Sequence, residues 1–149
     1  MSLDTAHTNL KALLLGDAGL TNWANTHFAK TLTAVDGNVP VKSLDTGNLP
    51  VIVFEIDDGD SAGQATGGKR QLFRFGWKLA LMWHEEDRAK AFTQRKQLPE
   101  LLAKAVMVNN TLSGAVGGAW LDDFDPDRGV NHPRHVFRTT IRAEMNVNA

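Results

Sequence analysis

The fold of this chain is decided by residues 71–83, which read QLFRFGWKLALMW. Every second position in this segment carries a large apolar side chain, and the positions between them carry basic, small or flexible ones. The apolar set is Phe73, Phe75, Trp77, Leu79, Leu81 and Trp83, and the other set is Arg74, Gly76, Lys78, Ala80 and Met82. Successive side chains of a β-strand point to opposite faces, so a period of two predicts a strand. We expect one face of this long strand to lie in the core and the other to be available for contact.

Other segments also have the character of strands. Residues 51–56 read VIVFEI, a short β-branched run between a proline and an Asp-Asp-Gly turn, which favours a buried strand. Residues 118–124 (GAWLDDF) and 135–145 (HVFRTTIRAEM) are predicted as two more. In the last segment Phe137, Thr139, Ile141, Ala143 and Met145 face one way, and Arg138, Thr140, Arg142 and Glu144 face the other. A short strand is expected before the turn that begins at Asp36.

Three helices are expected from apolar residues at helical spacing. The first carries Leu3, Ala6, Leu10, Leu13 and Leu14 on one face, with Ser2 and Asp4 as candidate caps and Gly16 as its stop. The second runs from about Leu20 to Lys30, with Trp23 and Phe28 in the core. The third lies within residues 84–109, where the stripe Leu98, Leu101, Leu102 and Ala105 contains Pro99, a residue expected to kink or divide a helix.

This order of elements predicts an α+β fold with a mostly antiparallel sheet and helices packed on one face. The 149 residues have the usual size of one domain, and a hydrophobic content of 42% supports a real core, so residues 1–149 are expected to form a single domain. The polar stretch 57–70 (DDGDSAGQATGGKR) is expected to be either a flexible glycine-rich loop or the tip of an elongated hairpin.

Composition excludes several classes of function. Sixteen basic against seventeen acidic residues give a net charge of -1, which argues against general nucleic-acid binding. The chain has no cysteine, so disulfides, zinc–thiolate sites and thiol nucleophiles are absent, and a reducing compartment is favoured. No apolar run reaches the roughly 20 residues needed to span a bilayer, and the apolar cluster near the start lacks the basic lead-in of a signal peptide.

A phosphate-binding loop is suggested by Gly63 to Lys69, which has the spacing GxxxxGK. Two features argue against it. Residue 70 is Arg, so the hydroxyl that would hold magnesium is missing, and an alternating strand follows instead of a helix whose N-terminus would face the phosphate. We therefore expect no nucleotide site.

Metal-binding and catalytic patterns are likewise incomplete. Asp123, Asp125 and Asp127 begin like a calcium loop, but Arg occupies its sixth and twelfth positions. The pair His84-Glu85 lacks the second histidine of a metalloprotease helix, and His132 and His135, with Asp127 nearby, are separated by a proline. The acid pairs Asp57/Asp58 and Asp122/Asp123 are expected to be solvated caps, since a catalytic dyad needs burial. No catalytic, cofactor or metal residue is assigned, and an enzyme is not expected.

The arrangement as a whole resembles a known class of virion proteins. The segments that carry the resemblance are LPVIVFEIDDGD, FRFGWKLALMWHEEDRAKAFTQRKQLPELLAKAV and GAWLDDFDPDRGVNHPRHVFRTTIRAEM. They are similar to phage minor tail proteins of the tail-terminator type, which Mu-like phages and prophages carry. The resemblance covers most of the chain and rests on these patterns, not on a catalytic signature.

The resemblance implies a structural role in the virion. Its members would form a ring, typically a hexamer, on the last disc of tail-tube protein at the head-proximal end of the tail, after assembly in the host cytoplasm. The ring would stop tube polymerisation and offer a surface to the head connector, with DNA free to pass through its lumen. Two alternatives stay open: another head–tail joining or neck protein, and a small hydrolase or ligand-binding enzyme.

Two contact surfaces are predicted from the residues themselves. The first is the glycine-rich stretch with Asp57, Asp58, Asp60, Lys69 and Arg70. The second is the polar sheet face with Arg74, Lys78, Arg138 and Arg142, which would meet an acidic partner such as the turn around Asp123 and Asp125 of a neighbouring subunit. A disordered tip and an ordinary solvated sheet face are the respective alternatives.

Overall fold

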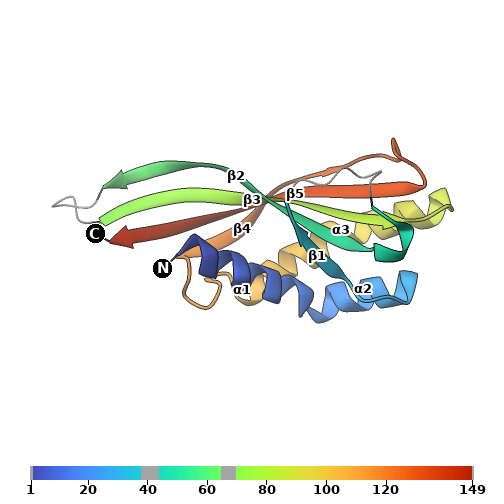
Figure 1. Cartoon of the computed structure of the whole chain (residues 1–149), viewed down its shortest axis with the longest axis horizontal. Helices are drawn as coiled ribbons and strands as arrows, with labels where there is room; N and C mark the ends of the chain where they lie inside the picture. Colours follow the sequence, from blue (N-terminus) through green and yellow to red (C-terminus); the bar gives the residue numbers. More distant parts are fainter. Residues whose placement is uncertain (1, 38–43, 65–69, 149) are drawn as a thin grey trace.

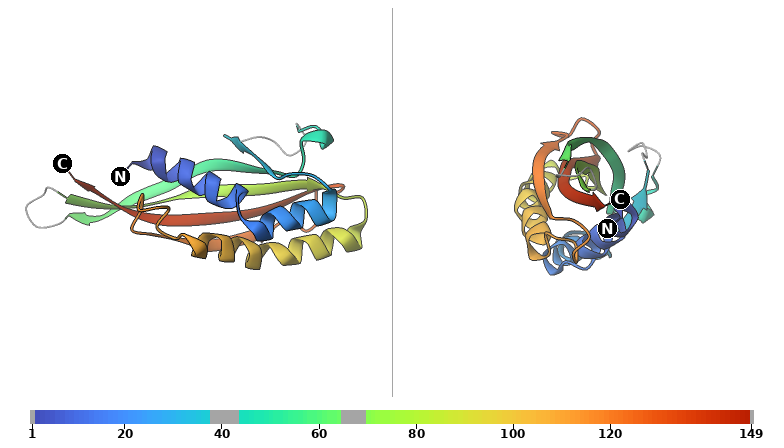
Figure 2. Two further views of the ribbon diagram at one scale, coloured as in Figure 1. Left: turned by 90° about the horizontal axis from the view of Figure 1, so that it is seen from below. Right: turned by 90° about the vertical axis from the view of Figure 1, so that its left-hand side faces the viewer.

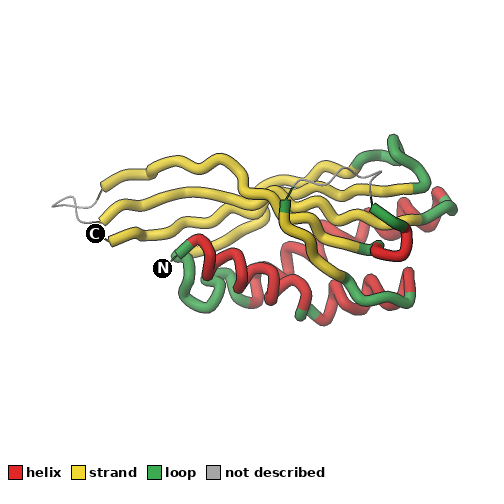
Figure 3. The backbone as a smooth tube through the Cα atoms, viewed as in Figure 1, coloured by secondary structure: helices red, strands yellow, loops and turns green. Residues whose placement is uncertain are grey.

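The computed structural model describes residues 2–37, 44–64 and 70–148. Three α-helices, a 3₁₀-helix and five strands are found in these ranges (Figure 3). Their bounds are α1 (Leu3–Leu15), α2 (Ala18–Phe28), β1 (Thr33–Asp36), η2 (Thr46–Asn48), β2 (Val51–Gln64), β3 (Arg70–His84), α3 (Arg88–Val108), β4 (Gly118–Pro126) and β5 (Arg134–Asn148). Every helix and strand expected from the sequence is present.

The five strands form one sheet in the order β1-β2-β3-β5-β4 (Figure 1). Only β1 and β2 pair in parallel, and the other three pairs are antiparallel. In the central pair, Phe75 lies opposite Ala143 and Trp77 opposite Ile141, so the large apolar residues of β3 and β5 share one face. The predicted α+β fold with a mostly antiparallel sheet is confirmed.

The three helices cover that apolar face (Figure 2). Trp77, Trp83 and Phe137 are almost completely buried beneath them, together with the inner faces of α1 and α3. Helix α1 begins and ends as its sequence predicts. The Ser2 side chain accepts a hydrogen bond from the Thr5 amide, and Gly16 closes the last turn.

Helix α3 is not divided at Pro99. A proline within a helix loses one backbone hydrogen bond, and burial of the apolar stripe on both sides of this position compensates for that loss. Leu98, Leu102 and Ala105 are each no more than 1% exposed. The helix is capped by Asp87, whose carboxylate accepts hydrogen bonds from the amides of Ala89 and Lys90.

Most of the stretch 57–70, for which a flexible loop was one expectation, is part of the hairpin formed by β2 and β3. Strand β2 continues to Gln64 and β3 starts at Arg70, so the elongated hairpin is the alternative that the structure has, and residues 65–69 lie outside the described residues. Two register shifts near Asp57 and Ser61 let the glycine-rich stretch remain paired. At Gly59 a Cβ would meet the carbonyl oxygen of Arg74 at 2.7 Å, so glycine permits this close approach.

The ends of β2, β3 and β5 project beyond the helices as a three-stranded arm, which comprises residues 63–64, 70–72 and 146–148 (Figures 1 and 2). The opposite end of the sheet is thicker. There, the face away from the helices carries a second apolar cluster of Leu49, Val51, Val53, Met82 and Val136, covered by residues that include Leu44. The expectation that this whole face is available was therefore wrong at one end, because the β1–β2 connection folds over it.

Candidate contact surfaces

The four cations predicted to share a sheet face do share it. Arg74 and Lys78 of β3 lie opposite Glu144 and Thr140 of β5, and Arg142 lies opposite Gly76. Arg138, opposite Ala80, has the same parity. All four side chains therefore belong to the outer face, which is the face that the helices do not cover.

This outer face is not a free positive patch, because acidic residues of the same chain pair with three of the cations. Nη2 of Arg142 lies 3.0 Å from Oδ2 of Asp57, and its Nε lies 3.4 Å from Oδ2 of Asp122. Lys78 Nζ lies 3.5 Å from Oδ1 of Asp57. Arg74 forms a separate pair, with its Nε 2.8 Å from Oε1 of Glu144. The expectation that these cations await an acidic partner gives way to an internal network that crosses four strands.

Arg138 differs from the other three. Within the ranges that the structure describes, it makes no ion pair, although Asp125 lies opposite it in the register between β4 and β5. Both residues are exposed. They are the members of the predicted charged surface that stay open to a partner.

The acidic residues predicted to form one turn are divided: Asp123 and Asp125 lie within β4, and Asp127 begins the turn that follows it. Asp123 Oδ1 accepts a hydrogen bond from the Thr140 amide at 2.9 Å. The carboxylate of Asp127 accepts from the amides of Gly129 and Val136, and lies 3.5 Å from Arg95. The carboxylate of Asp127 therefore caps the turn, whereas that of Asp123 links β4 to β5. Among the described residues, no group of three histidine or acidic side chains is placed to hold a metal ion.

Asp57 is the one residue of the predicted hairpin surface whose side chain is described. Asp58, Asp60 and Arg70 are strand residues, and only their backbone is described. Lys69 lies outside the described residues, as does the end of the phosphate-loop-like segment. Their role in contact remains a prediction.

A buried polar network, which the sequence analysis missed, joins α2, α3 and the end of β3. The side-chain amide of Gln94 accepts from Trp83 Nε1 at 2.8 Å and donates to Glu85 at 2.7 Å, and its backbone carbonyl accepts from Trp23 Nε1 at 3.2 Å. His135 Nε2 donates to the Glu85 carbonyl at 3.0 Å. The sequence signal was the glutamine on the apolar side of α3, one turn before Leu98.

The charged form of His135 is disfavoured in this setting. Burial lowers the pKa of its ring below the ordinary value, and this outweighs the opposing effects of the hydrogen bond to Glu85 and the nearby charge of Asp127. With Nε2–H as donor, its Nδ1 faces Arg95 Nη1 at 3.4 Å. The network satisfies buried polar groups and therefore has a structural role.

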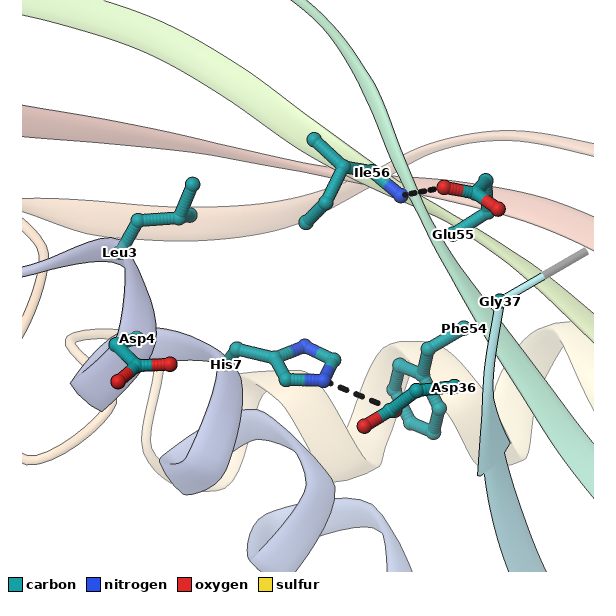
Figure 4. A pocket seen from close by; sticks show the side chains of 8 residues that line it. All are labelled: Leu3, Asp4, His7, Asp36, Gly37, Phe54, Glu55 and Ile56. Atoms are coloured by element: carbon teal, nitrogen blue, oxygen red, sulfur yellow. Dashed lines mark hydrogen bonds and ion pairs between the residues drawn. The ribbon is translucent and has the colours of Figure 1, made fainter.

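An open groove of about 450 Å³ lies where α1, β1 and β2 meet (Figure 4). It is lined by Leu3, Asp4, His7, Asp36, Gly37, Phe54, Glu55 and Ile56. Asp36 is bound by His7 at 3.0 Å and by Lys11 at 3.1 Å. Desolvation opposes ionisation of Asp36, but the hydrogen bonds and charges of Lys11 and His7 together outweigh it and lower its pKa. The groove therefore combines apolar walls with carboxylate side chains.

The groove also borders a free edge of the sheet. Strand β1 pairs with β2 only as far as Phe54, whose carbonyl accepts from Gly37. No described strand continues that edge. The next outward amide, that of Ile56, is bound by the side chain of Glu55 at 3.1 Å.

Exposed large apolar side chains are frequent in α3, in β4 and in the turn that follows β4. Of the nine in the described residues, six come from α3, β4 and the turn that follows it: Phe92, Met107, Val108, Trp120, Phe124 and Val130. Val130 is 84% exposed and Phe92 is 60% exposed. Phe92 lies near the start of α3, Met107 and Val108 lie at its end, and Trp120 lies opposite Arg142, so these side chains do not form one continuous patch.

The chain was compared with protein families, curated proteins and solved structures. No family model matches the chain, and no curated protein matches it. A chain of a solved structure described as "Virion of native gene transfer agent (GTA) particle" is similar with a TM-score of 0.43 and 13% identity, over 95% of this chain and 92% of that one. At this level the likeness carries no argument about function. None of the helices in the described ranges has the length and apolarity needed to cross a membrane.

Proposed function

We propose that this protein is a structural subunit of a phage-type virion that assembles with copies of itself into a ring, typically a hexamer. The ring caps the tail tube, stops its polymerisation and offers a surface for attachment of the head connector. The protein then belongs to the head-proximal end of the tail, with host cytoplasm as the place of assembly. The tail-tube protein and the connector are its proposed partners.

The observation that carries the proposal is the projecting arm. Three paired strands extend beyond the helices that cover the rest of the sheet (Figure 1). The outer edge of β2 in this region has no described partner strand, and an unpaired edge is a ready site for contact with another chain. An arm of this kind gives a small protein reach toward a neighbour.

The distribution of apolar side chains supports the same proposal. The flank formed by α3 and β4 exposes most of the large apolar residues, whereas the groove beside α1 lies on the other flank. A subunit in a ring uses two different surfaces, one for each neighbour. Two unlike flanks suit that arrangement.

The alternative of a head–tail joining or neck protein fits the same features, because these also assemble through exposed surfaces. The alternative of a small enzyme is less favoured. The groove holds one histidine, His7, and its ring is bound to Asp36, with Lys11 on the second carboxylate oxygen. This arrangement engages both carboxylate oxygens of Asp36, and the groove residues include no serine, threonine, cysteine or lysine that could serve as a nucleophile.

The experiment that tests the proposed location is immunogold labelling of particles made by the genome that encodes the chain. Label at one end of the tail, next to the head, is the expected result. Label along the whole tail or on the head shell would contradict the proposal, and unlabelled particles would show that the protein is not part of the virion.

A further inference from the structure

We propose that the groove beside α1 is a docking site for a second copy of this chain, and that the segment which enters it is the exposed Phe92 with the basic residues around it. This inference rests on the self-assembly proposed above and names the two surfaces that meet.

The groove has the chemistry of a receptor for a basic and apolar segment. Leu3 and Ile56 form its exposed apolar walls and are 40% and 48% exposed. Asp4 lies in the groove and Glu55 lies at its rim, where its side chain accepts a hydrogen bond from the Ile56 amide, and neither carboxylate makes an ion pair within the described residues. In Figure 4 Leu3, Asp4 and Ile56 lie around the open space with His7 between them, whereas Glu55 lies on the other side of β2, at the rim.

His7 adds a further sign of incompleteness. Its Nε2 is bound to Asp36, but its Nδ1 is buried without a hydrogen-bond partner in the described part of the chain. When Nε2–H donates, Nδ1 is an acceptor, and a buried acceptor without a donor costs free energy. A donor brought by a neighbouring chain would satisfy it.

The complementary surface lies at the start of α3. Lys96 Nζ lies 5.8 Å from the centre of the Phe92 ring, and Arg88 lies one turn before that ring. Arg88 also contacts the turn after β4, since its Nη1 lies 3.5 Å from the place that a Cβ of Gly129 would take. That turn presents Arg128 and the exposed Val130. We call these residues the basic-aromatic patch: Arg88, Phe92, Lys96, Arg128 and Val130.

Charge argues that the groove and the patch fit each other. In the described ranges, Arg88, Lys96 and Arg128 make no ion pair, and neither do the groove carboxylates of Asp4 and Glu55. Bringing the two together would pair these charges and cover apolar area on both sides, and electrostatic complementarity of this kind favours one register of docking. Two copies of the groove would repel each other, as would two copies of the patch.

Position argues that the contact propagates. The groove adjoins β1 and the patch adjoins β4, and these strands are the two opposite edges of the sheet. A contact between opposite flanks is heterologous, so each copy offers one surface to each neighbour and a ring results when the rotation closes. A two-fold dimer would need the same patch on both partners, which the charges oppose.

A charge exchange tests the inference. The patch variant is Arg88→Glu with Lys96→Glu, and the groove variant is Asp4→Lys with Glu55→Lys. Sedimentation velocity should show each variant alone associating at least about tenfold more weakly than the wild type. An equimolar mixture should associate again, because the reversed patch of one variant meets the reversed groove of the other. Restored association also shows that both variants fold. Lys104→Glu, exposed on the same helix, is the matched control and should associate normally.

The cysteine-free sequence allows a second measurement without background. Phe92→Cys and Ile56→Cys are purified separately, mixed and oxidised, and a mixed disulfide should form because bridged residues need Cα atoms within about 7 Å. Met107→Cys in place of Phe92→Cys is the control and should give no preferred product.

The outcomes separate the inference from the proposed function. Association of wild type and both charge variants to the same extent, with no mixed disulfide, would overturn this contact and leave self-assembly intact. A wild-type chain that stays monomeric at about millimolar concentration would contradict the self-assembly and, with it, this contact.

Discussion

Arg142 on β5 pairs with Asp57 on β2 at 3.0 Å, although β3 lies between these two strands. The residue of β3 that lies opposite Arg142 is Gly76, which has no side chain to stand in the way. The arginine therefore lies flat across β3. Its side chain links β5 to β2 across β3, and its Nε lies 3.4 Å from Asp122 on β4, at the edge of the sheet.

Replacement of Gly76 by alanine should destabilise the protein. The new Cβ would lie 2.8 Å from the Ile141 carbonyl oxygen and 3.3 Å from Cδ of Arg142, so the backbone or the arginine must shift. We expect a loss of about 1–3 kcal/mol in the free energy of unfolding, measured by urea denaturation. Gly118→Ala is the control, since nothing lies within 4 Å of its Cβ, and it should be close to neutral. Equal effects of the two substitutions would contradict this account.

Loss of Asp57 should cost more than loss of an exposed acid. The side chain of Asp57 is only 10% exposed and it pairs with both Arg142 and Lys78, so Asp57→Ala leaves two cations close together. A cost of about 1–2 kcal/mol is expected, between the values for surface and buried pairs. Glu100→Ala breaks an exposed pair with Lys104 and should cost less than about 0.5 kcal/mol. Thermal melts of both variants measure these losses of stability. An Asp57→Ala variant as stable as the wild type would contradict the expected cost.

Gln94 should be essential to the core because it bonds three partners. In Gln94→Leu, the indole N–H of Trp83 and the carboxylate of Glu85 lose their side-chain partner. An unsatisfied buried group costs about 1–3 kcal/mol, so denaturation should show a loss of that order. Gln97→Leu is a control on the next turn, where the side chain is exposed, and it should change stability little. A stabilised Gln94→Leu variant would show that the network is dispensable.

Stability should fall as the pH is lowered through the range below 6.5, the ordinary pKa of histidine. The folded-state pKa of His135 is depressed, so between that pKa and 6.5 the unfolded chain binds more protons than the folded one, and acid favours unfolding. Urea denaturation at about pH 7.5 and about pH 5.5 measures this. His135→Gln should reduce the difference, whereas His27→Gln should retain it. An equal pH dependence in both variants would contradict burial as the cause.

Much of the fold could be predicted because its signals are local. The alternation from Phe73 to Trp83 and from Phe137 to Met145 fixed which faces are buried, and Ser2 and Gly16 fixed the ends of α1. The hairpin was harder. Polar and glycine-rich residues are typical of loops, but pairing across β3 keeps the backbone extended as far as Gln64.

The contact surfaces were predicted less well, because they depend on residues far apart in the sequence. The shared face of Arg74 and Arg142 followed from the alternation alone. Their pairing with acids did not, since Asp57 meets Arg142 only once the strand order and the gap at Gly76 are known. The groove was missed for the same reason: Asp4 and Ile56 come together only through the packing of α1 beside β2.

The central claim is that this protein ends the tail tube, and tail length is its most direct measure. Particles from the encoding genome with this gene disrupted are examined by electron microscopy beside the wild type and a complemented strain. The account predicts abnormally long tails without heads, restored to normal by the intact gene. Tails of normal length separated from full heads would mean that the protein joins head and tail, and would contradict its role as a terminator.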